Sequence, residues 1–326
     1  MKVGLGLIGL GFIGNTHLKH SQKLVDARLV AVADLSKKAL RAAEGAGVSK
    51  VFADYKDLLK DPEVDAVIIA LPTHLHLQCA KEAAEAGKHI FLEKPIARNV
   101  EEAEEIVSIA RRDSVKLMVG YPLRFNSTFI DLKKEISSGT LGDVELAYAS
   151  YVSSGPFFHR NEGYAPVPVP DWWFNKDLTG GGVLIDLGSH MMNLLRWYFG
   201  EVTAIRSRLG YRLNMDFEDS ATCMIKFENG TIAVMGVGWF SRDQTLKVDL
   251  FGTVKHITAE HHPPNFIVTA AQVLTLGTSR YYWSHLAELQ HFVNCIVKDF
   301  SPSPSGEDGL RDLKALTKAY QNTMAL

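Results

Sequence analysis

The sequence has few cysteines, no long apolar run and no excess of charge of either sign. Three cysteines, Cys79, Cys223 and Cys295, lie far apart in 326 residues, so neither a disulfide framework nor a cysteine metal motif fits. A formal net charge of -2 gives no electrostatic reason to expect nucleic acid or an anionic membrane as a partner. These absences predict a protein of a reducing compartment, and we expect it to be cytoplasmic.

The apolar stretch from Val3 to Ile13 has the position of a signal peptide but not its features. Four glycines interrupt it, only Lys2 precedes it, and no small-residue cleavage site follows it. No other stretch reaches the ~18 uncharged apolar residues that a membrane span requires. With 46% hydrophobic and 22% charged residues, the composition is that of a soluble globular protein, and the length suits two domains.

The first half of the chain alternates apolar runs with helical segments. Strand-like runs cover residues 3–8, 27–34, 64–72, 89–95 and 115–122. The runs at 3–8 and 64–72 suit strands buried on both faces, and the run at 27–34 is alternating and β-branched. Segments of helical composition lie between them, beginning near Phe12 and covering 36–47, 74–88 and 99–113. This alternation predicts a doubly wound parallel sheet, which we assign to a dinucleotide-binding Rossmann domain over residues 1–121.

A G-x-G-x-x-G spacing, Gly9, Gly11 and Gly14, follows the first strand and opens the first helix. In this context Gly9 permits the turn, Gly11 lets the backbone approach a pyrophosphate, and Gly14 lets helix and strand pack closely. The amide groups at the start of the helix, at Phe12 and Ile13, would stabilise the phosphate charge. The motif therefore predicts a cofactor cradle rather than a tight turn without a ligand.

Asp34 ends the second strand, 20 positions beyond Gly14, where an acid that binds the adenosine ribose is expected. A carboxylate at this place repels a 2′-phosphate, which favours NAD over NADP. Lys37 and Lys38 follow closely and could serve a phosphate, or could form a solvated first turn of helix. NAD is therefore the expected cofactor, with NADP as the alternative.

After Tyr121 the pattern changes to strands without intervening helices. Strand-like segments cover 144–153, 203–211, 220–239, with a hairpin turn at 228–230, and 246–252. A long insertion between the first two becomes a helix from Val183 to Gly200. We assign residues 122–326 to a substrate-binding α+β domain built on an antiparallel sheet.

Two places in the chain carry candidate catalytic side chains. Asp186 and His190 are four residues apart and share one face of an apolar helix. They could be a structural pair, or a general base oriented by a carboxylate; a metal site lacks a third ligand at a recognisable spacing. Lys94 follows a buried strand at the edge where ligands bind in such sheets, and could stabilise a developing alkoxide.

Aromatic and basic residues in the long insertion are candidates for substrate contacts. Trp172 and Trp173 precede the helix that carries His190, and could line a sugar site or fill the domain core. Arg160 could bind a phosphate or carboxylate.

The segments "GLGFIGNTH", "LPTHLH", "EKP" and "GGGVLIDLGSH", in this order, resemble the Gfo/Idh/MocA oxidoreductase family. The likeness spans nearly the whole chain and includes the closing "SGEDGLRDLKALTKAYQNT". It implies a Rossmann domain followed by a domain with an open antiparallel sheet, whose free face commonly forms an oligomer interface. The resemblance, together with the apolar faces of "TIAVMGVGW", predicts a homodimer or homotetramer formed through this sheet.

The resemblance also implies residue roles. Lys94, Asp186 and His190 match the catalytic lysine, aspartate and histidine of the family, and the Lys94–Pro95 peptide is expected to be cis. Asn193 stands where the family often has an aspartate, so we assign it no proton transfer. The resemblance implies nicotinamide contacts from Pro72, Thr73, His76, Glu93 and Lys94, and substrate-site positions for Arg124 and Asn126.

These observations predict a dehydrogenase that oxidises a hydroxyl of a sugar, polyol or nucleotide-sugar. In this reading His190 removes the hydroxyl proton, Lys94 positions the hydroxyl, and Asp186 holds the imidazole. Two alternatives remain open: a glycosidase that retains NAD throughout its cycle, and a non-catalytic NAD-dependent sensor that binds a protein partner.

Overall fold

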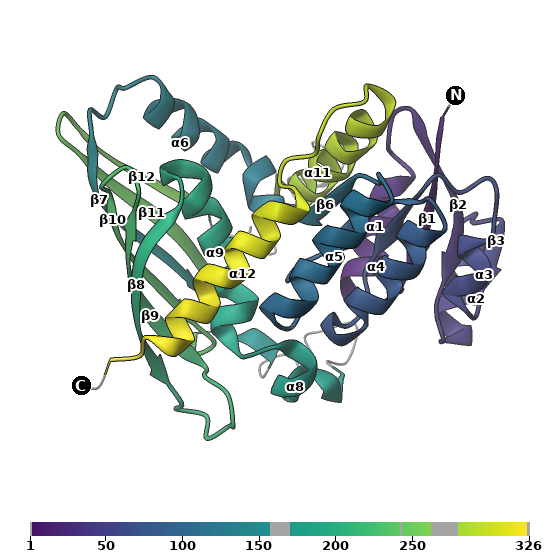
Figure 1. Ribbon diagram of the computed structural model, residues 1–326, viewed down its shortest axis with the longest axis horizontal. Helices are drawn as coiled ribbons and strands as arrows, with labels where there is room; N and C mark the ends of the chain where they lie inside the picture. Colours follow the sequence, from purple (N-terminus) through teal and green to yellow (C-terminus); the bar gives the residue numbers. More distant parts are fainter. Residues whose placement is uncertain (1, 157–169, 242, 262–279, 325–326) are drawn as a thin grey trace. The chain divides into compact units, whose positions relative to one another are not determined.

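The computed structural model describes residues 2–156, 170–241, 243–261 and 280–324. For residues 280–283 it describes the backbone alone. The chain divides into two compact units (Figure 1). Unit 1 comprises Met1–Pro122 and His285–Leu310, and unit 2 comprises Leu123–Ser284 and Arg311–Leu326.

Unit 1 is built on a parallel sheet with the strand order β3-β2-β1-β4-β5-β6, in which each pair of neighbours is parallel. The order reverses at β1, as it does in a doubly wound fold, so the predicted fold class is confirmed. The strands are β1 (Val3–Ile8), β2 (Ala27–Ala33), β3 (Lys50–Phe52), β4 (Ala66–Ile69), β5 (His89–Glu93) and β6 (Leu117–Gly120).

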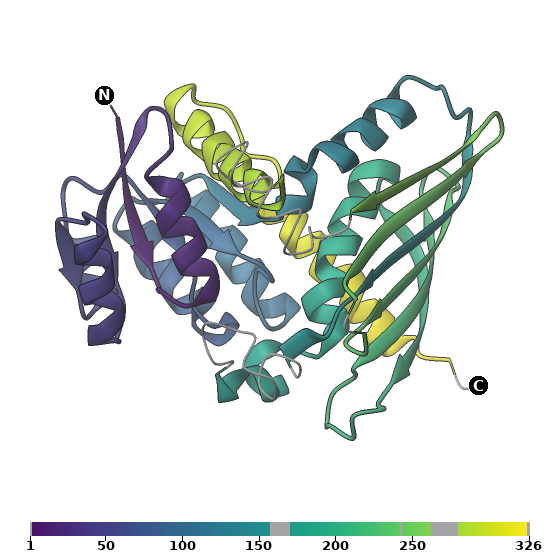
Figure 2. The ribbon, with the colours of Figure 1, turned by 180° about the vertical axis from the view of Figure 1, so that it is seen from behind.

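Helices cover both faces of this sheet, with α1 on one face and α4 and α5 on the other (Figures 1 and 2). Burial on both faces explains why the central strands are apolar runs rather than alternating ones. The helices of the first segment are α1 (Phe12–Ser21), α2 (Lys37–Gly45), α3 (Tyr55–Leu59), α4 (His76–Glu85) and α5 (Val100–Arg112), with a short 3-10 turn, η1 (Thr73–Leu75).

The chain returns to unit 1 late in the sequence. Helix α11 (Arg280–Val297) packs on the sheet, and the Phe292 ring lies 5.8 Å from that of Phe91 on β5. Residues 285–310 therefore group with unit 1, whereas the sequence pattern predicts that they belong to the second domain. A helix near the end of a chain shows its apolar face in the sequence, but not the sheet on which that face packs.

Unit 2 contains a second sheet with the order β12-β11-β7-β10-β9-β8. The expected antiparallel sheet is mixed, because β7 and β10 pair in parallel. The long insertion after β7, which contains a helix, supplies the crossover that a parallel pair needs. The strands are β7 (Val144–Val152), β8 (Val202–Gly210), β9 (Ser220–Phe227), β10 (Ile232–Gly238), β11 (Thr245–Gly252) and β12 (His256–His261).

Helix α9 (Val183–Phe199) packs on β7, β9 and β10, and buries one face of this sheet. The opposite face exposes large apolar side chains, namely Tyr148, Met224, Ile232 and Phe251. The alternation of buried and exposed residues along β9 shows that this face belongs to the regular pleat. The other helical segments are η2 (Pro122–Phe125), α6 (Ser127–Ser137), η3 (Asp171–Phe174), α8 (Lys176–Thr179) and α12 (Gly306–Gln321).

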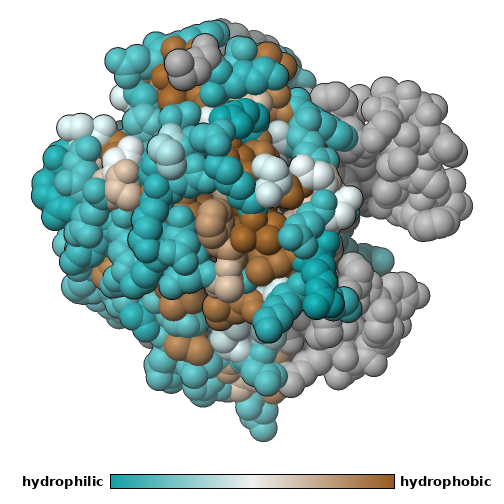
Figure 3. Space-filling view, turned by 90° about the vertical axis from the view of Figure 1, so that its right-hand side faces the viewer, coloured by the Kyte–Doolittle hydropathy of each residue, from teal (hydrophilic) through white to brown (hydrophobic). Residues whose placement is uncertain are grey.

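The side of the molecule on which α2 and α3 lie is mostly hydrophilic, with apolar side chains gathered near the centre of the view (Figure 3). Within the described ranges, no helix combines the length and apolar character needed to cross a bilayer.

Candidate functional site

The glycine loop between β1 and α1 has the geometry that its sequence predicts. Gly9 has a φ of +94°, and a Cβ added there would lie 2.5 Å from the carbonyl oxygen of Ala70. A Cβ on Gly14 would lie 2.0 Å from the carbonyl oxygen of Gly9, so only glycine lets α1 start this close to the strand. At Gly11 nothing lies within 4 Å of an added Cβ, which leaves the backbone open to a ligand.

The first turn of α1, which begins at Phe12 and Ile13, is suited to an anion. Its N-cap, Gly11, has no side chain to accept a hydrogen bond from the free amides, and the turn contains no acidic residue. Nearby, Asp34 accepts hydrogen bonds from the backbone amides of Leu10, at 2.6 Å, and Ser36, at 2.7 Å. These two bonds hold the carboxylate in one orientation beside the glycine loop.

The segment after β4 carries three predicted nicotinamide contacts. Pro72 is half-buried and Thr73 is 6% exposed. His76 is 1% exposed: its Nδ1 lies 3.0 Å from the carbonyl oxygen of Pro95, and its Nε2 lies 2.9 Å from that of Leu71. This ring therefore ties the segment after β4 to the segment after β5. A direct contact of His76 with a cofactor stays a prediction.

Glu93 and Lys94 lie at the carboxyl end of β5. Lys94 is half-buried between buried neighbours, and the peptide bond to Pro95 is cis, as the resemblance implies. Glu93 is 7% exposed; it accepts a hydrogen bond from His17 Nε2 at 2.6 Å and one from the Lys94 backbone amide at 3.2 Å. Its carboxylate is thus occupied by the protein itself.

In unit 2, Asp186 and His190 lie on the one stripe of α9 that is not fully buried. They are half-buried, as is Trp197, while the remaining positions of the helix are buried. The ring of His190 lies 6.1 Å from that of Tyr151 on β7. The helix therefore presents these two polar side chains along a partly open face, as the i, i+4 spacing predicts.

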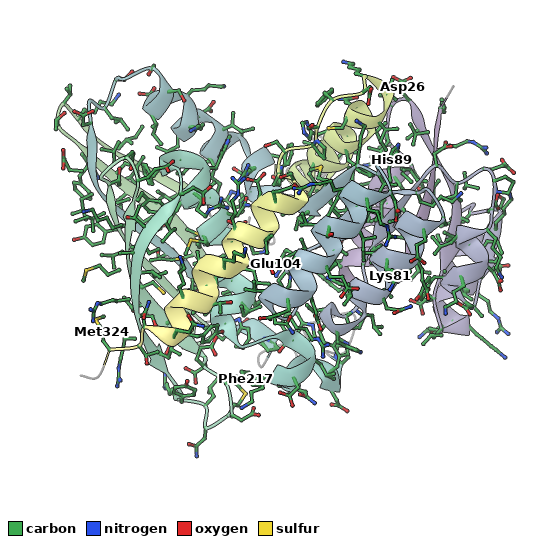
Figure 4. The ribbon with its side chains drawn as sticks, viewed as in Figure 1. Asp26, Lys81, His89, Glu104, Phe217 and Met324 are labelled. Carbon is green, nitrogen blue, oxygen red and sulfur yellow. The ribbon has the colours of Figure 1, made fainter. Side chains whose placement is uncertain are left out.

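The N-terminus of α9 is held by a carboxylate from another part of unit 2. Glu218, next to Phe217 (labelled in Figure 4), is 2% exposed and accepts hydrogen bonds from the amides of Gly182, at 3.1 Å, and Leu184, at 2.9 Å. Tyr320 donates a third at 2.7 Å. Burial raises the pKa of Glu218, although these hydrogen bonds oppose the shift. The carboxylate takes the place of the missing N-cap side chain.

A buried polar network lies farther along the same helix. The amide of Asn193 accepts a hydrogen bond from Arg124 Nε at 2.7 Å and donates one to Asp312 at 2.6 Å. Asp312 also accepts a hydrogen bond from Arg196 at 2.6 Å. A neutral amide can donate and accept in this way, whereas an ionised aspartate at position 193 would set two carboxylates together. The departure from the family pattern thus has a structural reason.

Burial and the hydrogen-bond partners of Asp312 have opposite effects on its pKa. It is 0% exposed, and burial raises its pKa to about 6 from 3.8, although Arg196 and Asn193 favour the charged form. Arg124, predicted to line the substrate site, is 8% exposed and lies 5.7 Å from the Trp197 ring. Its main contacts are therefore within the protein.

The remaining predicted substrate residues have different surroundings. Asn126 is 4% exposed and caps α6 by accepting a hydrogen bond from the Thr128 amide at 3.0 Å. Trp172 and Trp173 are half-buried in η3, with rings 6.0 Å apart, and Trp173 lies 6.4 Å from Trp239. Trp239 was not among the predicted residues. Arg160 lies outside the described residues.

Comparison with known proteins agrees with these features. Residues 3–121 match a family model described as "Oxidoreductase family, NAD-binding Rossmann fold", and residues 129–258 match one described as "GFO/IDH/MocA C-terminal domain". The chain belongs to the Gfo/Idh/MocA family of oxidoreductases. The N-terminal part is accordingly an NAD-binding Rossmann domain.

Several relatives of this chain are similar to it over nearly their whole length. It is 30% identical to an inositol 2-dehydrogenase of Rhizobium meliloti, over 100% of this chain and 98% of the relative. A myo-inositol 2-dehydrogenase of Thermotoga maritima is 28% identical, over 94% and 91%. A crystal structure of scyllo-inositol dehydrogenase from Lactobacillus casei, with bound NAD(H) and scyllo-inositol, has a TM-score of 0.83 at 22% identity, covering 99% of this chain and 97% of that one, and shows a common fold.

Three residues that sequence reasoning missed form hydrogen bonds with the predicted residues or with the helix that carries them: His17, Glu218 and Asp312. An acid or histidine beside a sequence motif can be recognised as a candidate, but its partner lies far along the chain and cannot be identified from the sequence. His17, the final residue of "GLGFIGNTH", was the one that the sequence could have indicated.

Asn193→Asp tests the role of the amide. We expect the free energy of unfolding to fall by about 2–4 kcal/mol near pH 8, because the variant buries two adjacent carboxylates. The loss should be smaller below pH ~6, where Asp312 binds a proton: its raised pKa gives stability at low pH that is lost as pH rises through this range. Urea unfolding at both pH values measures the difference.

Asn175→Asp is the matched control, because Asn175 is an exposed N-cap of α8 where a carboxylate is well accepted. Equal and small losses in both variants would contradict the proposed need for an amide at position 193.

Proposed function

We propose that this protein is an NAD-dependent dehydrogenase that oxidises a secondary hydroxyl of a cyclic polyol or sugar. The observation that carries the proposal is a complete glycine cradle with Asp34 in a chain whose relatives along its whole length include inositol dehydrogenases. Lys94, Asp186 and His190 match the catalytic lysine, aspartate and histidine of the family.

The glycine loop and its surroundings fit NAD. A Cβ at Gly11 would occupy the open space that the backbone presents, and the uncapped amides at Phe12 and Ile13 suit a pyrophosphate. The Asp34 carboxylate suits a ribose diol and disfavours a 2′-phosphate, so NAD is proposed rather than NADP. When bound, NAD supplies the hydride acceptor.

The protein side chains manage the proton. We assign the removal of the hydroxyl proton to His190 Nε2 or Nδ1, because an imidazole has a pKa suited to a general base near neutral pH. Asp186, on the same stripe of α9, orients the ring. The Lys94 ammonium donates a hydrogen bond to the hydroxyl oxygen and stabilises the negative charge that develops there. Trp172 and Trp173 offer aromatic faces to the C–H surfaces of a ring substrate.

His190→Ala tests the assignment of the base. We expect kcat to fall about 10²- to 10⁴-fold with a polyol or sugar that the wild type oxidises, while NAD affinity changes less than about threefold. Reduced cofactor is measured by absorbance with a panel of inositols, sugars, sugar phosphates and nucleotide-sugars, and the products are identified by mass spectrometry.

Near-normal turnover in His190→Ala would remove His190 from the mechanism. Sugar cleavage without net NADH in the wild type would instead identify a hydrolase that retains its cofactor.

Gly11→Ala tests the cradle. We expect the NAD dissociation constant to rise at least about tenfold, because the methyl group would enter the space of the pyrophosphate. The unfolding free energy should change by less than about 1 kcal/mol, since the added Cβ meets no protein atom within 4 Å. Isothermal titration calorimetry and urea unfolding give the two quantities.

Gly45→Ala in α2, where an added Cβ also meets nothing within 4 Å, is the control and should leave NAD binding unchanged. Equal NAD affinity in both variants would place the pyrophosphate elsewhere.

We also propose that the exposed apolar face of the second sheet joins copies of this chain. Met224→Lys combined with Ile232→Lys should lower the molar mass measured by light scattering, because two charges would enter an apolar interface. The control is Val25→Lys, which replaces an exposed apolar residue of unit 1. A wild type that is monomeric at all concentrations would refute the interface.

A further inference from the structure

Three ionisable side chains meet in the interior of unit 1. His17 comes from α1, Glu93 from the end of β5, and Glu288 from α11; one nitrogen or oxygen of each lies within 4.8 Å of the others. His17 and Glu288 are 0% exposed and Glu93 is 7% exposed. Ionisable groups are rarely buried without a partner. The protonation state and the hydrogen-bond partners of each group in this cluster therefore have to be considered.

Glu93 is the member with partners. One carboxylate oxygen accepts the 2.6 Å hydrogen bond from His17, and the other accepts the backbone amide of Lys94. Gly120 on β6 makes room for it, since an added Cβ would lie 3.2 Å from Glu93 Oε1. Burial, the largest single influence, would raise the pKa of Glu93, but the hydrogen bond from His17 together with the electrostatic effects of His17, His285 and Lys94 outweighs it, and the pKa is lowered. Glu93 is therefore the ionised acid.

Glu288 is in the opposite position. Neither of its carboxylate oxygens has a hydrogen-bond partner among the residues that the structure describes, although both are buried. Burial, followed by the neighbouring charge of Glu93, raises its pKa well above the ordinary value. Two adjacent carboxylates in one buried site do not both ionise unless a cation joins them.

Within the described part of the chain, the other titratable groups around the cluster are His20 on α1, His285 on α11 and Lys94. The His285 ring lies 6.3 Å from both His17 and His20. Burial and the neighbouring His285 lower the pKa of His20 to about 4, so His20 is neutral at neutral pH. His17, His285 and Lys94 all lower the pKa of Glu93.

The distances favour a proton over a metal ion. Two ligands of a tetrahedral zinc ion, each about 2.1 Å from the metal, are about 3.4 Å apart. The His17 and Glu93 atoms are 2.6 Å apart, which is the distance of a charge-assisted hydrogen bond. A cation would have to break this bond, whereas a proton on Glu288 leaves it intact.

We propose that this cluster positions Lys94: Glu93 is ionised and holds the Lys94 amide, His17 holds Glu93, and Glu288 stays neutral by carrying a proton. Glu93, His17 and Glu288 are thus positioning residues rather than catalytic ones. The proposal rests on the assignment of Lys94 to the reaction. It explains why Glu93, which directly precedes Lys94, is buried and accepts hydrogen bonds with both carboxylate oxygens.

Glu288→Gln tests the proton without any use of activity. Glutamine mimics the neutral acid, whereas wild-type Glu288 must take up a proton on folding wherever the unfolded chain is ionised. Relative to the variant, the wild-type folding equilibrium constant should therefore fall about tenfold for each pH unit above about pH 5, until the pH at which Glu288 ionises in the folded protein. Urea unfolding of both proteins across this range gives the slope. A pH-independent difference would overturn the neutral state of Glu288.

Glu93→Gln tests the positioning. An amide cannot accept both hydrogen bonds as the carboxylate does, so kcat should fall about 10- to 100-fold at saturating NAD and polyol, with KM changed less than about threefold. Glu82→Gln, which removes a carboxylate bonded to Lys56 and Gln78, is the control and should keep wild-type kcat. Equal kcat in these two variants would overturn the positioning role.

A second pair of variants guards against misfolding of Glu93→Gln. His17→Gln keeps a donor for Glu93 and His17→Leu removes it, so kcat should be lost in the leucine variant and largely recovered in the glutamine variant. Equal kcat in both would contradict the role of His17. A purely structural role would lower the melting temperature of both without this recovery.

Two further outcomes separate the alternatives. A stoichiometric divalent metal in the purified wild type that is absent from Glu288→Gln would overturn the proton in favour of a cation. Lys94→Ala with wild-type turnover would refute the proposed role of Lys94, while the pH slope of Glu288→Gln would still report on the cluster itself.

Discussion

A carboxylate that leaves water must gain a partner or a proton, and this constraint arranges the interior of both units. In unit 1, Glu93 gains His17 and a backbone amide. In unit 2, Glu218 gains the first amides of α9, and Asp312 gains Arg196 and an asparagine amide. In each case the acid fixes the backbone or helix that carries a candidate catalytic residue. The hydrogen bonds that offset the cost of burying each charge thereby also fix the positions of nearby side chains.

The alternating strands and helices of unit 1 and its glycine loop could be predicted, because each depends on residues close in sequence. The φ of Gly9 and the close approach at Gly14 follow from the need to turn a buried strand directly into a helix. The parallel pairing of β7 with β10 could not be predicted, since it joins strands separated by a long insertion and by two other strands, β8 and β9. The return of α11 to the first sheet has the same cause: its partner surface lies about two hundred residues earlier in the chain.

The candidate site shows the same division. The spacing of Asp186 and His190 places them on one stripe of α9, and the structure leaves that stripe partly open. The residues that hold this helix, Glu218 and Asp312, come from distant segments and carry no motif of their own. Asn193 is instructive, because the family comparison marks it as a departure while the hydrogen bonds explain it: between Arg124 and Asp312 only a side chain that both accepts and donates satisfies its neighbours.

The two acids near Lys94 show how environment, rather than residue type, assigns a charge. Glu93 and Glu288 have the same side chain and lie in one buried site, but among the residues that the structure describes only Glu93 has hydrogen-bond donors within reach. Ionising the second acid would oppose the first without a new hydrogen bond to offset the cost, so the proton stays on Glu288. With Glu288 neutral, Glu93 is the one ionised carboxylate of the pair, and it accepts the hydrogen bonds from His17 and from the Lys94 amide. Because Lys94 follows Glu93 directly in the chain, the placement of one buried proton bears on the orientation of the lysine backbone.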